Sequence, residues 1–164
     1  MRYHNITKDD MLNGDGLRVV LWLSGCSHKC KGCQNPVTWN PNDGLEFDEE
    51  AKREIYDQLD KDYISGITFS GGDPLFMGNR DEVLCLMKEI KEKYPDKTIW
   101  CYTGYTYEEL AKETPGFFKE LRKYVDTLVE GRYVEELRDV NLHWRGSSNQ
   151  HIIKFEDDRE DIYL

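Results

Sequence analysis

Residues 17–33 read LRVVLWLSGCSHKCKGC, an apolar run followed at once by three cysteines. The run from Leu17 to Ser24 is too continuous for a strand with one face in water, and it is typical of a strand covered on both faces. The cysteines then fall in the loop that leaves the end of that strand. This stretch therefore predicts a buried strand of a parallel sheet with a cysteine-rich loop directly after it.

Strand and helix patterns alternate along the rest of the chain. Asp48 is expected to cap a helix whose apolar residues recur every four positions, and Thr106-x-x-Glu109 resembles a capping box that opens another. A third helix is expected over residues 80–94, and an apolar helical stripe covers residues 117–124. Further strands are expected at residues 66–70, 98–102, 126–130 and 151–155.

This alternation indicates βαβ units and a parallel sheet. Right-handed crossovers would wrap the sheet into an arc, and five strands are too few to close an eight-stranded barrel. We therefore expect an α/β fold, an open partial (β/α) barrel of about five mostly parallel strands with helices on the outer face.

Length and charge narrow the class of protein. A chain of 164 residues is expected to form one domain, residues 1–164. Its net charge of −10 argues against nucleic acid as a partner, because that binding needs a basic face. No run approaches the ~20 apolar residues of a membrane span, and the N-terminus lacks a signal sequence, so a cytoplasmic protein is expected. The acidic close, residues 156–164, is expected to be a solvated end.

Three motifs follow the first three expected strands. The cysteine loop follows the first, Gly71-Gly72-Asp73-Pro74 the second, and Thr103-Gly104 the third. Chemistry in such sheets sits beyond the carboxyl ends of the strands. The three motifs are therefore expected on one rim.

The cysteine loop has the spacing C-x3-C-x2-C, formed by Cys26, Cys30 and Cys33. Disulfides are rare in a cytosolic chain, whereas thiolates so close in sequence suit a soft metal centre. A [4Fe-4S] cluster ordinarily takes four cysteines, so three would leave one iron open. Zinc held by the three thiolates with His28, and a redox pair at Cys30 and Cys33, are the alternatives.

The remaining candidates receive structural interpretations. His28 is expected to be an exposed loop residue. Cys85 and Cys101 are expected to be buried thiols that pack as small apolar residues. Lys29 and Lys31 would give the cysteine loop a local positive charge on an acidic protein.

The cysteine spacing and the Gly-Gly-acidic-Pro turn resemble the radical S-adenosylmethionine superfamily. Within it, the chain is similar to the glycyl-radical activases of anaerobic (class III) ribonucleoside-triphosphate reductases over residues 3 to 153. The motifs that carry this resemblance are Asn13-Gly14-Asp15-Gly16-Leu17-Arg18, residues 71–75, residues 99–105 and Trp144-Arg145-Gly146-Ser147-Ser148-Asn149-Gln150. Related activases usually have proline where Asp15 stands.

The resemblance implies the ligands of two cofactors. Cys26, Cys30 and Cys33 would hold three irons of one [4Fe-4S] cluster, and S-adenosylmethionine would bind the fourth. Gly32, Cys33 and Gln34 would pass close to that cofactor. Gly72 and Asp73 would meet its methionine ammonium group.

The roles of Thr103, Glu130 and Arg145 stay open. The first two lie at strand ends, and Arg145 belongs to a run that is also a natural turn.

The resemblance also implies a reaction and two partners. Reductive cleavage of S-adenosylmethionine would give a 5′-deoxyadenosyl radical, which would take a hydrogen atom from a glycine of the large reductase subunit. Reduced flavodoxin or a similar protein would supply the electron. The alternatives are an activase of the pyruvate formate-lyase type, a radical enzyme acting on a small molecule, and a zinc-binding adaptor.

Overall fold

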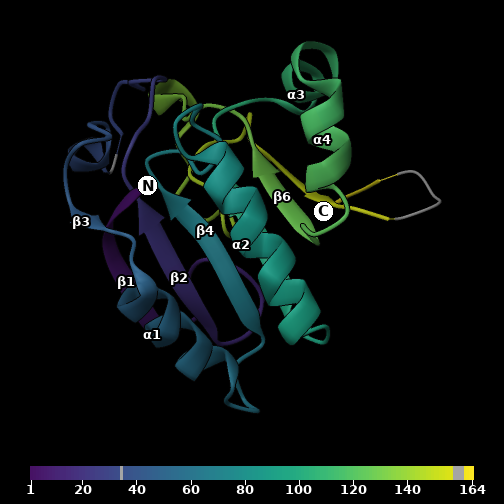
Figure 1. Ribbon diagram of the computed structural model, residues 1–164. Coiled ribbons are helices and arrows are strands. Elements are labelled where there is room, and N and C mark those ends of the chain that lie inside the picture. The colour runs from purple at the N-terminus through teal and green to yellow at the C-terminus, as the bar shows by residue number, and fades with distance from the viewer. Residues whose placement is uncertain (34, 157–160) are drawn as a thin grey trace.

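The computed structural model describes residues 1–33, 35–156 and 161–164 (Figure 1). Within these residues, eight strands form one sheet and four α-helices accompany it. The strands are β1 (Arg2–Asp10), β2 (Arg18–Leu23), β3 (Leu45–Glu46), β4 (Gly66–Gly71), β5 (Thr98–Tyr102), β6 (Thr127–Glu130), β7 (His151–Lys154) and β8 (Ile162–Tyr163). The helices are α1 (Glu49–Leu59), α2 (Arg80–Lys93), α3 (Tyr107–Glu113) and α4 (Pro115–Leu121), with the short 3-10 helices η1 (Pro36–Thr38) and η2 (Glu135–Leu137). None of the described helices combines the length and the apolarity needed to cross a bilayer.

The sheet is parallel at its centre and antiparallel at both sides. Its order is β3-β1-β2-β4-β5-β6-β7-β8, in which β2, β4, β5 and β6 run parallel. The α/β class is therefore confirmed, and the five expected strands all form. The expected count was too low and the proportion of parallel pairs too high, because β1, β3, β7 and β8 pair antiparallel. β1 escaped the prediction because it is a mostly polar strand in which only Ile6 is buried.

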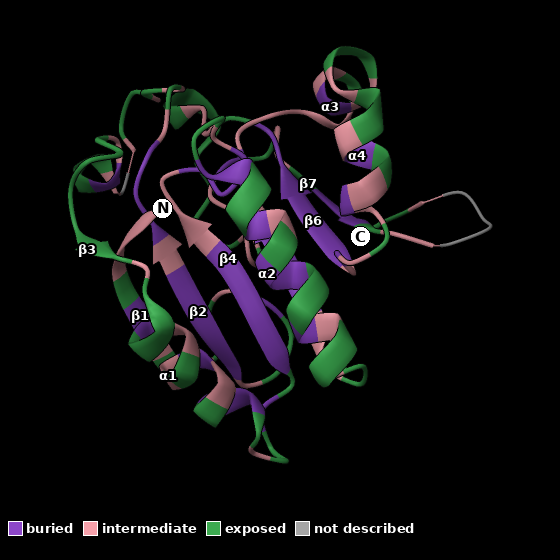
Figure 2. Ribbon diagram, viewed as in Figure 1, coloured by how far each residue is buried: buried purple, intermediate pink, exposed green. Residues whose placement is uncertain are grey.

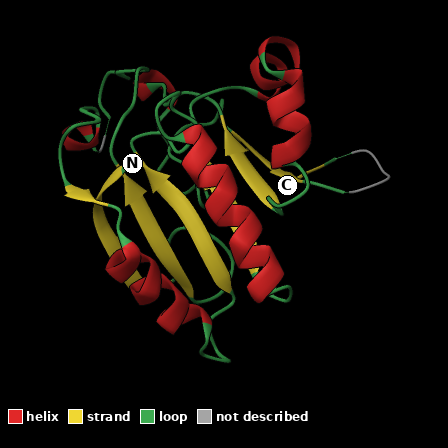
Figure 3. Cartoon of the chain, in the orientation of Figure 1, coloured by secondary structure: helices red, strands yellow, loops and turns green. Residues whose placement is uncertain are grey.

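The two faces of the central sheet have different surroundings. Alternate residues such as Leu21, Phe69 and Cys101 face helices α1 and α2 in a buried core, and these helices lie along β2 and β4 (Figures 2 and 3). Successive side chains of a strand point to opposite faces. The residues between them, such as Trp22 and Tyr102, therefore face the other side and are free to line a site.

Helix signals in the sequence are largely confirmed. Asp48 accepts a hydrogen bond from Ala51 N at 2.9 Å as the N-cap of α1. Thr106 accepts one from Glu109 N at 3.1 Å and opens α3. The apolar stripe at residues 117–124 does not continue that helix, because Pro115 starts a separate helix, α4.

Cys101 agrees with the sequence-based expectation, whereas Cys85 and one carboxylate of the acidic close, Asp161, do not. Cys101 is fully buried, as expected, whereas Cys85 lies on the exposed side of α2. Asp161, in the acidic close, is not a solvated carboxylate, because it forms a two-point ion pair with Arg122 and its side chain is only 6% exposed. Residues 157–160 of the acidic close lie outside the described residues.

Arg18 ties the amino-terminal edge of the sheet together. Its side chain is buried, and its five N–H groups donate to Thr68 Oγ1, Thr98 Oγ1 and the carbonyl oxygens of Asp15, Ile67 and Thr98 at 2.8–2.9 Å. Burial lowers the pKa of Arg18 to about 10. All five donors of the guanidinium are paired without any carboxylate. The Thr68 hydroxyl in turn donates to Asn13 O at 2.6 Å, which holds the 11–17 loop under the sheet.

Replacing Arg18 should destabilise the protein strongly. Arg18→Met keeps most of the buried volume but leaves several buried carbonyl oxygens without donors, each costing about 1–3 kcal/mol. We expect the free energy of unfolding in urea to fall by about 3 kcal/mol or more. Arg53→Met, on the exposed face of α1, is the matched control and should change it by less than about 0.5 kcal/mol. Equal effects of the two substitutions would contradict the anchoring role of Arg18.

Candidate functional site

A cavity of about 630 Å³ opens at the carboxyl ends of the parallel strands. Its wall is built from the inward-facing side chains of Trp22, Ser70, Tyr102 and Val129, one from each parallel strand. The register pairs Trp22 with Ser70 and Tyr102 with Val129, so the four strands end at one edge. The loops that follow them close the rest of the wall.

The three cysteines of the C-x3-C-x2-C motif line this cavity together. All three are free thiols of intermediate exposure. Asn35 N donates to Cys33 Sγ at 3.4 Å. Burial raises the pKa of the Cys26 thiol, while hydrogen bonds from the main chain at His28 and Lys29 act in the opposite direction. Soft sulfur ligands that already receive N–H donors suit an iron–sulfur centre.

The three cysteines come from one loop and line the same cavity. No three His, Cys, Asp or Glu side chains in the described part of the chain form a group that could hold a single metal ion. In a four-iron cube each thiolate binds its own iron at a separate corner. A cluster therefore does not require its three thiols to lie within reach of one metal ion.

The Gly-Gly-Asp-Pro turn packs directly against the base of the cysteine loop. Gly72 N donates to Leu23 O at 2.8 Å, and Asp73 N donates to Gly25 O at 2.7 Å. A Cβ on Gly72 would stand 2.4 Å from Gly25 O. Glycine is therefore required at position 72 by close packing of two main chains, and Gly72 also lines the cavity.

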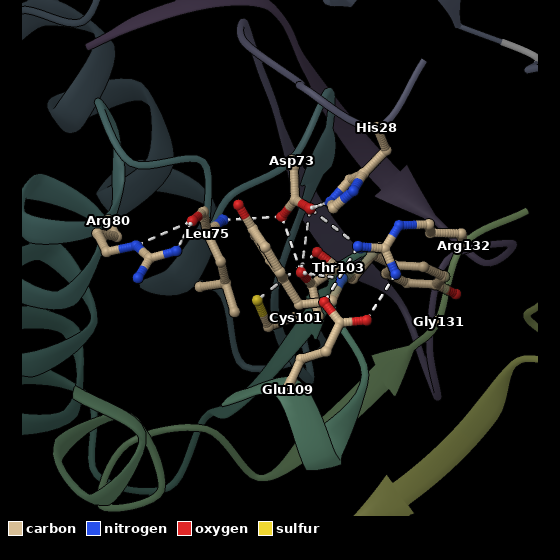
Figure 4. Close-up of polar contacts among 12 residues, drawn as sticks. His28, Asp73, Leu75, Arg80, Cys101, Thr103, Glu109, Gly131 and Arg132 are labelled. Atoms are coloured by element: carbon tan, nitrogen blue, oxygen red, sulfur yellow. Dashed lines mark hydrogen bonds and ion pairs between the residues drawn. The ribbon is translucent and has the colours of Figure 1, made fainter. Parts of the chain in front are cut away.

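Asp73 is buried and is not one of the cavity-lining residues. Figure 4 shows the polar contacts of its carboxylate. Its carboxylate accepts from four donors. Leu75 N donates at 2.9 Å, the Thr103 hydroxyl at 2.9 Å, Gly104 N at 3.0 Å and His28 Nε2 at 2.6 Å. An ionised carboxylate offers about four acceptor positions. The carboxylate of Asp73 is thus fully used within the protein.

His28 is not the exposed loop residue that the sequence suggested. Its side chain is 5% exposed and lines the cavity next to the cysteines. The ring makes an edge-to-face contact with Tyr105, with 4.7 Å between centroids. The expectation failed because the loop between Cys26 and Cys30 turns inward over the strand ends, where Asp73 provides a partner that is distant in the sequence.

Of the other predicted site residues, some line the cavity and some contact the protein outside it. Gly32 does not line the cavity, and a Cβ there would stand 2.8 Å from the Glu135 carboxyl group. Gln34 lies outside the described residues. Thr103 lines the cavity and donates to Asp73. The Glu130 carboxylate accepts a hydrogen bond at 2.6 Å from the main-chain N–H of Tyr107, the first residue of α3.

The late Arg-Gly-Ser-Ser-Asn-Gln segment is a self-bonded loop on the far wall. Arg145 Nη1 donates to Gln150 O at 2.5 Å, and Gln150 Oε1 accepts from Gly146 N at 2.9 Å. Trp144 stands directly before this loop and has a left-handed backbone (φ 61°). Its carbonyl oxygen accepts a hydrogen bond from the Tyr102 hydroxyl at 2.6 Å. Arg145 and Trp144 both line the cavity.

Arg132 is a cavity residue that the sequence did not single out. Its guanidinium binds the Glu109 carboxylate at two points, at 2.6 and 3.0 Å (Figure 4). These hydrogen bonds lower the pKa of Glu109 and raise that of Arg132. The sequence pattern could not indicate this residue, because its partner Glu109 lies on α3, 23 residues earlier in the chain than Arg132 in the loop after β6.

The sequence is similar to one family of iron–sulfur proteins over most of its length. Residues 12–153 match a family model described as a 4Fe-4S single cluster domain. The chain is 42% identical over 152 residues to the anaerobic ribonucleoside-triphosphate reductase-activating protein of Enterobacteria phage T4, covering 93% of each chain. Proteins of the same name from Vibrio cholerae and Escherichia coli strain K12 are 41% and 40% identical, over 94% and 92% of this chain and 99% and 96% of theirs. The chain therefore belongs to the family of anaerobic ribonucleoside-triphosphate reductase-activating proteins.

Proposed function

We propose that this protein is a radical S-adenosylmethionine enzyme that activates an anaerobic ribonucleoside-triphosphate reductase. It would bind one [4Fe-4S] cluster through Cys26, Cys30 and Cys33 and bind S-adenosylmethionine in the same cavity. The observation that carries the proposal is that three free thiols line one cavity together with Gly71 and Gly72 of the Gly-Gly-Asp-Pro turn. The family model and the names of the relatives support it.

The cavity would serve as the mouth of an open partial (β/α) barrel in a single domain, residues 1–164. Four parallel strands that share an edge, with helices α1 and α2 along one face, support this description. A glycine-bearing segment of the large reductase subunit needs an open mouth of this kind to reach a bound cofactor. The proposal also keeps the protein in the cytoplasm, where such a reductase works.

A reduced [4Fe-4S] cluster held by these thiols would supply the electron for splitting S-adenosylmethionine into methionine and a 5′-deoxyadenosyl radical, and this radical would take a hydrogen atom from the target glycine. The chain's own residues do the positioning. The three thiols would hold the irons, while Gly32, Cys33, Gln34, Gly72 and Asp73 lie in the segments that the resemblance assigns to the cofactor. Apolar groups such as Val129 and Trp144 line the cavity and would limit access of water to the radical.

The function can be tested directly. The protein is reconstituted with iron and sulfide without oxygen, then mixed with dithionite, S-adenosylmethionine and a candidate reductase. A glycyl doublet in the EPR spectrum of the reductase is the expected result. Formation of 5′-deoxyadenosine without a doublet would reject this target, and a colourless, air-stable protein would favour the zinc alternative.

The cysteines can be assigned by substitution. Cys26→Ala, Cys30→Ala and Cys33→Ala should each abolish stable binding of about four irons per chain, because each removes a ligand. Cys85→Ser is the matched control, since Cys85 is an exposed thiol outside the cavity. Iron and sulfide analysis with the absorption spectrum measures the result. Loss of iron from Cys85→Ser equal to that from Cys30→Ala would overturn the ligand assignment.

Lys29 and Lys31 should guide an acidic electron donor to the cluster loop. Both are exposed, and neither forms an ion pair within the described residues. On a chain of net charge −10, they provide a local positive charge beside the thiols. Reduced flavodoxin, or a similar acidic protein, is the proposed donor.

Reversing these charges should slow one reductant only. The double variant Lys29→Glu/Lys31→Glu should slow reduction of the cluster by flavodoxin, while reduction by dithionite is unchanged. Lys88→Glu/Lys119→Glu, on the outer surfaces of α2 and α4, makes the same change in net charge and serves as control. Stopped-flow absorbance measures both rates. Equal slowing with both reductants would exclude a docking role.

A further inference from the structure

We propose that His28 and Asp73 form a clamp that positions the cysteine loop, so that the Asp73 carboxylate holds His28 instead of the ammonium group of S-adenosylmethionine. This inference rests on the proposed function, because it takes Cys26 and Cys30 to be cluster ligands. His28 is then a positioning residue that acts through the thiols on either side of it.

The first argument is the occupancy of the carboxylate. Four donors surround Asp73, and its side chain is 1% exposed. They come from the cysteine loop, the turn after β4 and the loop after β5. An ammonium group could reach the carboxylate only by displacing one of these donors and by opening the buried site. Leaving a buried donor without its partner is costly, so the occupied state is favoured.

The second argument is the shape of the seat that receives the imidazole ring. Gly104 lies under the ring, and a Cβ on that residue would stand 2.4 Å from His28 Cδ2. Tyr105 closes one side of the ring with an edge-to-face contact. The ring of Tyr105 is itself packed under Arg80, whose guanidinium carbon lies 5.5 Å from its centroid. Arg80 donates to Leu75 O at 2.7 and 3.0 Å, which returns the network to the turn that carries Asp73.

The third argument is the position of His28 in the chain. It stands midway between Cys26 and Cys30, next to Lys29, which has a left-handed backbone (φ 50°). At its base the loop is bonded to the end of η1, because Gly25 N and Cys26 N donate to Thr38 O and Trp39 O at 2.6 and 3.1 Å. Within the described part of this loop, His28 is the side chain that ties its far end to the strand ends. Releasing it would let the two thiols move relative to each other.

The clamp is tested with variants that distinguish the aromatic ring of His28 from its hydrogen-bond donor. His28→Phe keeps an aromatic ring in the seat and removes the N–H group, whereas His28→Gln keeps an N–H donor of similar reach. Gly104→Ala fills the seat without altering either partner of the bond. Gly116→Ala is the matched control, because a Cβ there would meet nothing within 4 Å.

The readouts are taken on the reconstituted holoprotein before any reductase is added. We expect His28→Phe, Asp73→Asn and Gly104→Ala to lose iron to a chelator about tenfold faster and to change the EPR spectrum of the reduced cluster, as loss of a residue that supports metal ligands generally does. His28→Gln should restore both properties in part, and Gly116→Ala should match the unaltered protein. A purely structural role elsewhere would not change the cluster spectrum.

Binding of S-adenosylmethionine to the loaded fraction of each variant distinguishes the two roles of Asp73. The clamp predicts that His28→Phe and Asp73→Asn weaken this binding to a similar extent, and that the double variant is no worse than either. A loss confined to Asp73→Asn, with an unchanged cluster in His28→Phe, would overturn the proposal and return Asp73 to the ammonium group.

The metal-free protein provides an independent check, because the hydrogen bond between His28 and Asp73 involves no atom of the cluster. Urea unfolding of His28→Phe, Asp73→Asn and the double variant should show coupling between the two sites, with the double variant less destabilised than the sum of the single ones. Strict additivity would reject the clamp. Failure of the unaltered protein to assemble a cluster would instead reject the proposed function, and the coupling would still decide whether the clamp exists.

Discussion

The shape of the cavity depends on one buried carboxylate. Asp73 accepts hydrogen bonds from Leu75 N, the Thr103 hydroxyl, Gly104 N and His28 Nε2, and these groups belong to three different loops. A carboxylate removed from water is stable only when its acceptor positions are filled. The loops must therefore converge on Asp73 for the chain to fold, and the cysteines are carried to the cavity wall as a consequence.

At the opposite edge of the sheet, the buried Arg18 guanidinium likewise holds several segments together. Arg18 is surrounded by hydroxyl and carbonyl oxygens of β4, β5 and the 11–17 loop, without a carboxylate among them. Asp73 is likewise met by neutral main-chain and hydroxyl donors, together with His28. Each charge is thus stabilised by dipoles that belong to several segments. Both edges of the parallel sheet are fixed in this way, which leaves its inward face open for the cavity.

Local signals in the sequence were sufficient for most of the fold and for the rim of the site. The runs at 66–70 and 98–102 form strands, as expected of short segments rich in β-branched and aromatic residues. Because loops at one edge of a parallel sheet lie together, Thr103 and Gly72 were expected on one rim, and both line the cavity. The strand β1 was missed because it is mostly polar and only Ile6 in it is buried. The contact of His28 with Asp73 could not be predicted, since it joins residues 45 positions apart and depends on the exact path of a loop.

The alternation of side chains along the strands also decides how many thiols reach the cavity. Cys101 lies on β5 directly before Tyr102, so it faces the helices and is fully buried in the core, where burial raises its pKa well above the ordinary value. Cys85 lies on the exposed side of α2. Of the five cysteines, only Cys26, Cys30 and Cys33 line the cavity, and the nearest imidazole, His28, has its Nε2 engaged by Asp73. A four-iron cluster held here would therefore have one iron without a thiolate from this chain, and it is the topology of the sheet that withholds the fourth ligand.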